Sequence, residues 1–415
     1  MKIIFVTRLF SGLEKSFLTK KWSPTGVPTI YKMIELLDRT HDTEFLFTVK
    51  DSGKGYFSSW KAKSNTRIKV DKLNKNIVII SGVRRFPFFL GRKIRIAFRE
   101  MYQFTYILLC VLRNRPNVLY CDNSNIIVGA IVARILKNVS VVFRVMGINQ
   151  HMYKVINNNG IILSFYKWIY KSPFKIVICT QDGSGVELWV NKAFRNNTNV
   201  KILVNGVDSF DKRPVLNNNI KKLISNKTSI LFVGKLEIYK GCFEFIKAIE
   251  ILINKDLKNF HVIVIGNGTQ RDRLISYINN FQEKGYITFI DSLPNSEILS
   301  LHRYTDIYVS MNHLGNLSNA NLEAISSNDC IVIPEAQYEK GIDIITNKLL
   351  GEAVTRVPIN NPEILSSILF DLVNNRSKRE LLSSLIKKKK KSFLYSWDER
   401  LNYELKLLSL LDNKK

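Results

Sequence analysis

The sequence predicts an α/β protein made of two doubly wound domains. Short β-branched runs alternate with amphipathic helical stretches over most of the 415 residues, and this alternation is typical of parallel sheets with crossover helices. At roughly 100–200 residues per domain, the length favours two domains. A polar stretch at residues 209–228 has little periodicity and separates two series of elements, so we expect the linker there.

Each series can be followed element by element. Strands are expected in the first half at residues 2–6, 44–48, 76–80, 118–121, 140–143, 176–179 and 201–204. In the second half they are expected at 230–233, 261–265, 287–290, 307–309 and 330–333. Val27, Ile30, Ile34 and Leu37 have helical spacing, with Pro28 in the first turn, where its missing N–H costs little. Further helices are expected at 243–253, 271–280 and 297–304.

The end of the chain predicts one more helix. Leu401, Leu405, Leu408 and Leu411 fall on one helical face within residues 397–411. This segment is long enough to pack back across a domain boundary. We therefore expect domains at residues 1–210 and 211–390, with residues 391–415 returning to the first domain.

The charge points to an anionic partner. Lys plus Arg number 62 and Asp plus Glu 35, which gives +27. Nucleic acid, an anionic membrane or a phosphorylated substrate would each suit this excess, and so would a merely solubilising lysine surface. The five cysteines form no CxxC pair, which argues against a disulfide framework and a structural zinc site. The chain lacks the run of about 20 apolar residues that spans a bilayer, so we expect a cytoplasmic protein.

Residues 83–115 mix arginines with aromatic residues. Arg84, Arg85, Arg92 and Lys93 lie in this stretch among several Phe and Tyr residues. Such a mixture suits a membrane surface or single-stranded nucleic acid. No RNA-recognition, KH or zinc-finger signature supports nucleic acid. The alternative is that the aromatic side chains are core and the arginines their solvated edge.

Residues 230–241 predict a phosphate-binding loop. An apolar strand ends at Gly234, Lys235 and Lys240 follow, and a helix begins after Gly241. A helix N-terminus with two lysines suits a diphosphate. The alternative is an ordinary strand-to-helix loop whose lysines are solvated.

Two more strand-to-helix turns follow. The first contains Gly266 and Gly268, which permit either a tight turn or the approach of a nucleotide. Arg271 stands where a GxGxxG fingerprint needs glycine, so hydride transfer is disfavoured. In the second, residues 316–320 are mostly small and polar, and Glu323 lies near the start of a helix. This turn suits an anion and ribose hydroxyls, or it is simply a capped helix.

Together with Asn205-Gly206-Val207-Asp208, these segments in this order resemble the family-four retaining glycosyltransferases of the GT-B fold. Thr305-Asp306, Leu322-Glu323-Ala324 and Ser396-Trp397-Asp398-Glu399 match further motifs of that family. The resemblance covers most of the chain and is strongest from Val204 to Ala324. It implies two Rossmann-like domains facing a cleft, the first on the acceptor side and the second binding a nucleotide-sugar donor.

The resemblance also implies roles for individual residues. Lys235 and Lys240 would bind the donor diphosphate and Glu323 the nucleotide ribose, which makes these three the expected catalytic set. The expected donor-binding residues are Gly26, Gly234, Gly266, Gly268, Leu317, Ser318, Asn319 and Ala320. The residues expected on the acceptor or membrane side are Arg84, Arg85, Arg92, Lys93, Arg144 and His151.

Two positions depart from the family pattern. The first glutamate of the family's paired motif is replaced by Gly315, and a histidine near the sugar is replaced by Met146. His151 lies nearby as a substitute for the histidine, and His313 and Asn312 for the glutamate. Both departures fall on the sugar side and leave the nucleotide side intact.

The leading hypothesis is a glycosyltransferase that moves a sugar from a nucleotide diphosphate to a glycan or lipid-linked acceptor, as in surface polysaccharide assembly at the inner face of the plasma membrane. No DxD motif occurs, so transfer is expected to need neither metal nor cofactor and to proceed with retention. Two lysines and helix N-termini would stabilise the leaving group. The alternative is a catalytically weak homologue that binds nucleotide or a partner. A nucleic-acid partner is not expected.

Overall fold

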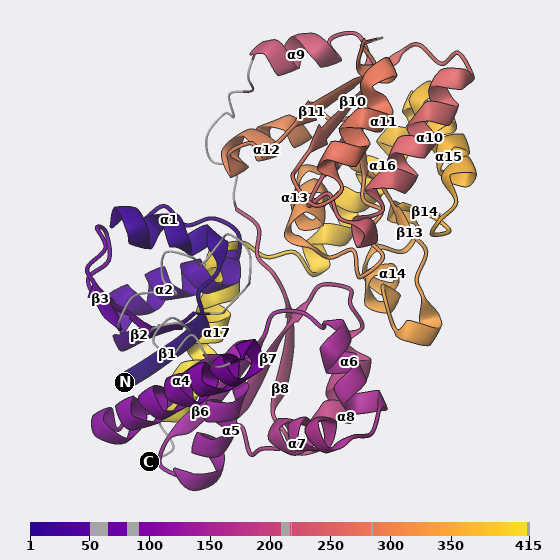
Figure 1. Ribbon diagram of the computed structural model, residues 1–415. Helices are drawn as coiled ribbons and strands as arrows, with labels where there is room; N and C mark the ends of the chain where they lie inside the picture. Colours follow the sequence, from indigo (N-terminus) through magenta and orange to yellow (C-terminus); the bar gives the residue numbers. More distant parts are fainter. Residues whose placement is uncertain (50–64, 81–90, 209–215, 217, 284, 413–415) are drawn as a thin grey trace. The chain divides into compact units, whose positions relative to one another are not determined.

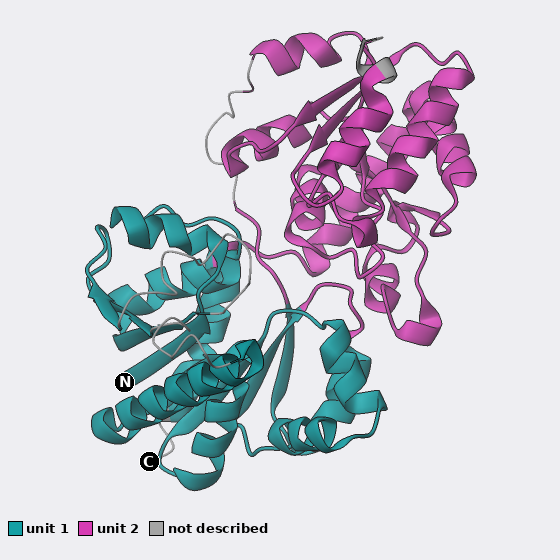
Figure 2. Cartoon of the chain, in the orientation of Figure 1, with its two compact units in different colours: residues 1–180, 187–203, 398–415 teal, residues 181–186, 204–397 magenta. Residues whose placement is uncertain are grey.

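The computed structural model (Figure 1) describes residues 1–49, 65–80, 91–208, 216, 218–283 and 285–412. The chain forms two compact units, drawn in teal and magenta in Figure 2. Unit 1 comprises residues 1–180, 187–203 and 398–415, and unit 2 comprises residues 181–186 and 204–397. The main changes of unit therefore lie after residues 203 and 397, compared with the predicted 210 and 390.

Unit 1 is built on an eight-stranded sheet with the order β3-β4-β2-β1-β5-β6-β7-β8. Its strands are β1 (Lys2–Arg8), β2 (Asp42–Thr48), β3 (Thr66–Ile68), β4 (Ile77–Ile80), β5 (Val118–Asp122), β6 (Ser140–Val145), β7 (Ile176–Gln181) and β8 (Val200–Val204). The pairs from β4 to β7 are parallel, and β3 adds an antiparallel edge to β4. Because helices cover such a sheet, its central strands are almost continuously apolar and buried.

The helices of unit 1 are α1 (Ser11–Thr19), α2 (Pro28–Thr40), α4 (Arg92–Asn114), α5 (Ile126–Ile135), α6 (Gln150–Asn157), α7 (Ile161–Tyr170), α8 (Val186–Ala193) and α17 (Trp397–Asp412). The helix α5 packs between α4 and α7. Among the described helices, none is both long and apolar enough to cross a bilayer.

The C-terminal helix α17 is anchored in unit 1 by a buried charged cluster. Glu404 accepts hydrogen bonds from the Tyr120 hydroxyl and, at 2.7 Å, from Arg400. The guanidinium of Arg144 on β6 lies 3.6 Å from the same carboxylate and donates to the Thr180 hydroxyl at 2.9 Å. Arg144 is completely buried. Its prediction as an acceptor- or membrane-side residue is therefore wrong, because its charge is used inside the unit.

Unit 2 is built on a parallel six-stranded sheet with the order β11-β10-β9-β12-β13-β14. Its strands are β9 (Thr228–Val233), β10 (Phe260–Ile265), β11 (Ile287–Ile290), β12 (Ile307–Val309), β13 (Cys330–Pro334) and β14 (Thr355–Val357). Its helices are α9 (Asn218–Ile224), α10 (Cys242–Asn254), α11 (Arg271–Glu283), α12 (Asn295–His302), α13 (Asn319–Ser327), α14 (Ile344–Leu350), α15 (Pro362–Asn374) and α16 (Arg376–Lys389).

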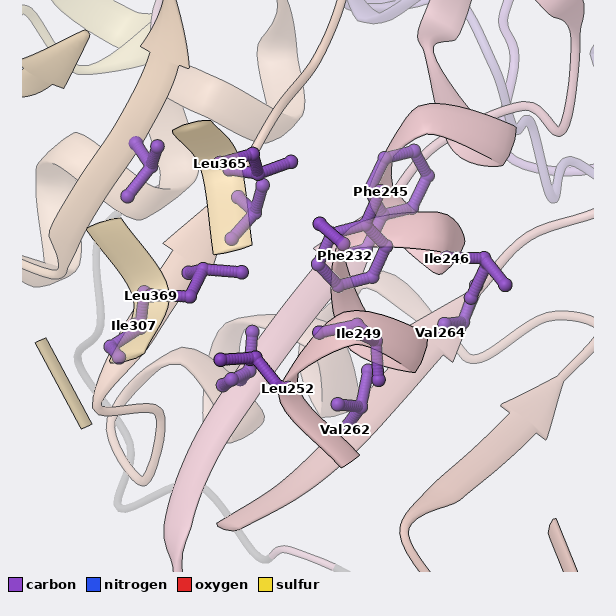
Figure 3. Close-up of a cluster of buried hydrophobic side chains, with 14 of the residues drawn as sticks. Phe232, Phe245, Ile246, Ile249, Leu252, Val262, Val264, Ile307, Leu365 and Leu369 are labelled. Atoms are coloured by element: carbon purple, nitrogen blue, oxygen red, sulfur yellow. The ribbon is translucent and has the colours of Figure 1, made fainter. Parts of the chain in front are cut away.

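A hydrophobic core holds α10 and α15 against this sheet (Figure 3). Phe232 on β9 stacks on Phe245 of α10 with ring centroids 5.2 Å apart. Leu365 and Leu369 from α15 join the same cluster and are fully buried. This packing fixes the start of α10 at the end of β9, where the basic loop lies.

The two parallel Rossmann-like sheets confirm the predicted α/β class. Every strand predicted from the sequence is present within one or two residues of its expected ends. The short strands β3 and β14, of three residues each, were not predicted. The stretch predicted as a structureless linker contains α9, whose Ile220 is buried in a core cluster of unit 2.

Candidate functional site

The predicted donor residues of unit 2 gather at the carboxyl ends of three adjacent strands. Lys235 and Lys240 follow β9, Gly266 and Gly268 follow β10, and residues 310–319 follow β12. In this sheet β10 and β12 lie on opposite sides of β9, so the strand order reverses at β9. Ligands of open α/β sheets bind beyond the carboxyl ends of the strands at such a switch point.

The loop after β9 presents two lysines in different settings. Lys235 is exposed, whereas Lys240 is half-buried at the end of a short 3-10 turn just before α10. Burial lowers the pKa of Lys240, the nearby Asp182 carboxylate raises it, and Lys235 lowers it further. Among the described residues Lys240 forms no ion pair, and its ammonium lies 5.5 Å from the centre of the Tyr239 ring. The loop therefore holds a desolvated positive charge at the start of a helix.

The glycines after β10 serve first to press two loops together. A Cβ on Gly266, whose φ is +151°, would overlap the carbonyl oxygen of Gly234, and one on Gly268 would overlap that of Leu236. The Leu236 amide donates to the Asn267 carbonyl at 3.0 Å, and the Gln270 amide donates back to Leu236 at 2.9 Å. These two positions need glycine for close packing of the backbone.

A carboxylate ties the same two loops together. Glu237 accepts hydrogen bonds from the Thr269 amide at 3.1 Å and from the Thr269 hydroxyl at 2.6 Å. These bonds lower the pKa of Glu237, against a small opposing effect of burial. The loop after β10 thus holds the basic loop in position. Glu237 is a structural residue that was not predicted from the sequence.

The loop after β12 is held by a network of buried polar groups. Asp343 accepts hydrogen bonds from the Asn316 amide and side chain, both at 2.7 Å, and from the Thr346 hydroxyl at 2.7 Å. Asn312 donates to the Gly315 carbonyl. The loop is therefore rigid in front of α13, whose N-cap Ser318 makes no side-chain bond to the first free amides of the helix.

A segment from the first half of the sequence completes this region. Residues 181–186, which follow β7, belong to unit 2 by their contacts. A Cβ on Gly315, whose φ is +124°, would come within 2.5 Å of the Asp182 carbonyl oxygen and 2.7 Å of the Ser184 amide. The Asp182 carbonyl also accepts from the Leu317 amide at 3.1 Å. The place of a side chain at position 315 is thus filled by this segment.

Asp182 is the functional candidate that the sequence did not reveal. Its carboxylate accepts from the Ser184 amide at 3.0 Å and hydroxyl at 2.5 Å. Burial raises the pKa of Asp182, and the hydrogen bonds from Ser184 act against this rise. The available signal was Asp182-Gly183-Ser184-Gly185, a glycine-rich turn directly after a strand, but nothing local connects it with Lys240.

Glu323 lies on α13, one turn into the helix. Its carboxylate accepts a hydrogen bond from the Asn295 side chain at 2.9 Å. Burial raises the pKa of Glu323, and the Asn295 bond opposes this. At the start of the same helix the side-chain oxygen of Asn319 accepts a hydrogen bond from the Asn205 side-chain amide at 2.8 Å, so the predicted 205–208 crossover contacts α13.

The remaining predicted site residues belong to unit 1. Gly26, with φ +92°, lies between α1 and α2, and His151 is exposed on α6 with its ring 5.3 Å from that of Tyr166. Arg92 and Lys93 are exposed at the start of α4. Arg84 and Arg85 lie outside the described residues.

A large pocket in unit 2 lies elsewhere. It has a volume of about 530 Å³ and sits at the amino ends of β12 and β13, beside α16. Its lining includes His302, whose ring pairs with the buried Asp329 at 2.7 Å. Because ligands of such sheets bind at the carboxyl ends of strands, we assign the functional site to the glycine turns and treat this pocket as separate.

Comparison with known proteins finds a family similar to most of unit 2. Residues 216–391 match the family described as "Glycosyl transferases group 1". This region holds the basic loop, both glycine turns and Glu323, so the likeness falls on the part of unit 2 that carries the candidate site.

Relatives extend over part of the chain. Two uncharacterized glycosyltransferases of Methanocaldococcus jannaschii, MJ1069 and MJ1059, are 26% and 24% identical to it over 219 and 266 residues. The matches cover 52% and 58% of this chain, and 53% and 64% of the two relatives.

Solved structures match over the whole length. A sucrose-phosphate synthase from Thermosynechococcus elongatus superposes with a TM-score of 0.69 at 11% identity, covering 99% of this chain and 100% of its own. Anabaena Alr3699/HepE, in complex with UDP-glucose, has a TM-score of 0.65 at 14% identity and covers 99% of each chain. At such identities the likeness shows the fold, which is GT-B.

Proposed function

We propose that this protein is a glycosyltransferase that takes its sugar from a nucleotide diphosphate. The observation that carries the proposal is the pair Lys235 and Lys240 at the switch point of the sheet, in the region that is similar to group 1 glycosyltransferases. Glu323 lies on α13, the helix that follows the neighbouring strand β12. Lys240 is desolvated and forms no ion pair among the described residues. A diphosphate would supply the missing counter-charge, and Glu323 would accept hydrogen bonds from the ribose.

The chemistry follows from the charges. As the bond between the anomeric carbon and the diphosphate oxygen breaks, negative charge grows on the leaving group. Lys235, Lys240 and the amides at the start of α10 would stabilise that charge, a role that a metal ion plays elsewhere. We therefore propose a metal-independent reaction that requires no cofactor and proceeds with retention. The nucleotide-sugar donor is supported by the structural neighbour Anabaena Alr3699/HepE, which was solved in complex with UDP-glucose.

The sugar side of the site must differ from the family pattern. Position 315 has no room for a glutamate, because residues 182–184 occupy that space. Asp182 is the carboxylate that the same segment brings toward Lys240. We propose that Asp182 supplies the sugar contact that the family obtains from the first glutamate.

The acceptor is proposed to be a glycan or a lipid-linked saccharide, as in surface polysaccharide assembly at the cytoplasmic face of the membrane. The excess of positive charge supports an anionic acceptor or surface. The exposed Arg92 and Lys93 at the start of α4 also support it.

A second candidate function is nucleotide or partner binding without turnover. It is favoured by the loss of the glutamate at Gly315 and of the histidine at Met146. The two functions are separated by incubating the protein with a panel of nucleotide sugars and acceptors, with and without a chelator, and measuring released nucleoside diphosphate. We expect release that a chelator does not abolish. Saturable donor binding without any release would favour the second function.

A further inference from the structure

The helix α7 turns apolar side chains toward the solvent. Ile161 and Ile162 are 93% and 70% exposed, and Phe165 and Trp168 are 43% and 44% exposed. The spacing of residues 161, 165 and 168 places them along one side of the helix. The opposite side is anchored, because Ile169 and Tyr170 are buried in unit 1. One side of α7 therefore packs in the core of unit 1, and its other side is apolar and exposed.

The neighbouring helix extends this apolar face. The guanidinium of Arg134 on α5 stacks on the Trp168 ring at 3.9 Å and donates to the Trp168 carbonyl at 2.8 Å. Ile135, the next residue, is 67% exposed. Phe165 and Trp168 are themselves stacked, with ring centroids 6.1 Å apart. We call Ile135, Ile161, Ile162, Phe165 and Trp168 the α7 patch.

The stretch of sequence that contains the α7 patch has basic residues and no acidic ones. Residues 123–181 contain seven Lys or Arg and no Asp or Glu. One of these cations, Arg144, is buried, but Lys137, Lys154, Lys171 and Lys175 are exposed. None of those four lysines pairs with a carboxylate among the described residues. Apolar and aromatic side chains in a stretch of chain that also exposes unpaired cations are the composition that an anionic bilayer surface binds.

We propose that the α7 patch is the face through which this protein binds an anionic membrane, with Ile161, Ile162, Phe165 and Trp168 entering the interface and the lysines contacting the headgroups. Trp suits the boundary between headgroups and acyl chains, and long lysine side chains reach outward from it. A protein partner would also cover apolar residues, but the absence of carboxylates across 59 residues favours a surface of phosphate groups. The inference goes beyond the proposed transfer reaction, since membrane binding requires no donor.

The predicted membrane stretch around α4 is the competing surface. It also exposes apolar residues, among them Met101 and Leu109. However, Arg99 points inward and pairs with Glu100, and Glu100 also lies 3.6 Å from Arg8. The α4 helix therefore carries a carboxylate, whose charge also reaches Tyr166 of α7, whereas the residues of the α7 patch are all uncharged. We expect the α4 face to contribute less.

The test is sedimentation of the full chain with phosphatidylcholine–phosphatidylglycerol vesicles and with phosphatidylcholine vesicles alone. We expect binding to the anionic vesicles only. The double variant Ile161→Ser/Phe165→Ser should reduce the bound fraction by about tenfold, since it removes two inserting side chains. Ile364→Ser/Leu381→Ser, which changes two comparably exposed residues of unit 2, is the matched control and should bind as the wild type does.

A second measurement uses Trp168 as a reporter. Brominated lipids in the anionic vesicles should quench tryptophan fluorescence, and the Trp168→Phe variant should lose that quenching. Nucleoside diphosphate binding by the Ile161→Ser/Phe165→Ser variant should be unchanged, so that failure of this proposal and failure of the proposed function are distinguishable.

Three results would overturn the proposal. One is equal vesicle binding by the wild type and the α7 double variant. Another is loss of binding only in a Met101→Ser/Leu109→Ser variant, which would place the contact on α4. The third is an oligomer in solution that the α7 substitutions dissociate without any change in vesicle binding, which would make the α7 patch a contact between copies of this chain.

Discussion

Each unit of the molecule contains a desolvated cation, and the two differ in whether the protein supplies a paired carboxylate. In unit 1, Arg144 is fully buried but faces Glu404 and the Thr180 hydroxyl. In unit 2, Lys240 interacts electrostatically with the Asp182 carboxylate and the Lys235 ammonium, and it forms no ion pair among the described residues. A paired buried charge belongs to the structure, whereas a desolvated charge without a partner in the fold is available to a ligand.

The surroundings of the two cations lead to the same distinction. Arg144 lies on a central strand and ties α17 into unit 1 through Glu404. Lys240 lies on a loop at a switch point, and that loop is fixed from outside by Glu237 and by the glycine turn at Gly266. Rigid support around an unpaired charge is what preorganised stabilisation of a leaving group requires.

Removing the Glu404 carboxylate tests the structural role of Arg144 and should have the largest effect. Glu404→Ala should lower the free energy of unfolding by about 3–5 kcal/mol, because it leaves Arg144 buried without its carboxylate. Chemical denaturation measures this. The matched control is Arg144→Met/Arg400→Met/Glu404→Leu, which removes both arginines together with the carboxylate that they face and should recover much of the loss. A small effect of Glu404→Ala would contradict a structural role for Arg144.

The pH dependence of the same cluster has a definite sign. Burial alone would raise the pKa of Glu404, but Arg144 and Arg400, together with the Tyr120 hydroxyl, hold it below its usual value. The stabilisation is therefore present at neutral pH and is lost as the pH falls through the folded-state pKa, below about 4.5. The Glu404→Gln variant should show a weaker acid dependence.

Lys240→Ala should have the opposite profile. We expect the rate of transfer to fall by about 10²–10³-fold, the usual cost of removing one stabilising group from an oxyanion. Stability should change by less than about 1 kcal/mol, since no partner in the protein is lost. Single-turnover kinetics and denaturation on the same preparation check both. Lys247→Ala on α10 is a control lysine that we expect to be neutral in both assays.

The glycine contact between the two loops should be sensitive to a single methyl group. Gly266→Ala should lower the stability of unit 2 by about 1–3 kcal/mol, because its Cβ would overlap the Gly234 carbonyl oxygen. Gly234→Ala is the matched control, since nothing lies within 4 Å of a Cβ there. Equal melting temperatures for the two variants would show that the loops are not in contact.

Glu323→Gln should weaken donor binding by about tenfold, the cost of replacing a charge-assisted hydrogen bond with a neutral one. Asn295→Ala tests the neighbour that holds the carboxylate and should have a smaller effect. Calorimetry with the nucleoside diphosphate alone gives the affinity. Undiminished affinity in Glu323→Gln would remove the residue from the site.

The smallest expected effect is on the pH dependence of binding. Because burial lowers the pKa of Lys240, its charge in the free protein is lost at a lower pH than that of an ordinary lysine. Affinity for a diphosphate should therefore fall as the pH rises through that lowered pKa. The Lys240→Ala variant should lack this fall.

The sequence predicts the fold and the basic loop well for a physical reason. Strand, turn and helix signals at Gly234 to Gly241 are local, and the period of the apolar residues records burial directly. The strands β3 and β14 were not predicted. Both lie at a sheet edge, and the two contain only one buried residue each, whereas the equally short β12 is central and completely buried.

Features that depend on distant contacts were not predictable. Arg144 looks like an exposed cation until β6 and α17 are brought together, and Asp182 lies 133 residues before Gly315 in the chain. The apolar composition of the α7 patch alone would predict that it is buried in the core. Only the packing of Ile169 and Tyr170 shows which side of that helix is covered.

The proposed binding of a donor diphosphate by Lys240 is tested most directly by adding nucleoside diphosphates to the wild type and to Lys240→Ala. The shift in melting temperature reports the binding. A bound ligand raises stability by about 2.7 kcal/mol at a hundred times its dissociation constant. We predict that at least one member of a UDP, GDP and ADP panel stabilises the wild type and fails to stabilise Lys240→Ala at the same concentration. Stabilisation of both to the same extent, or of neither by any member of the panel, would contradict it.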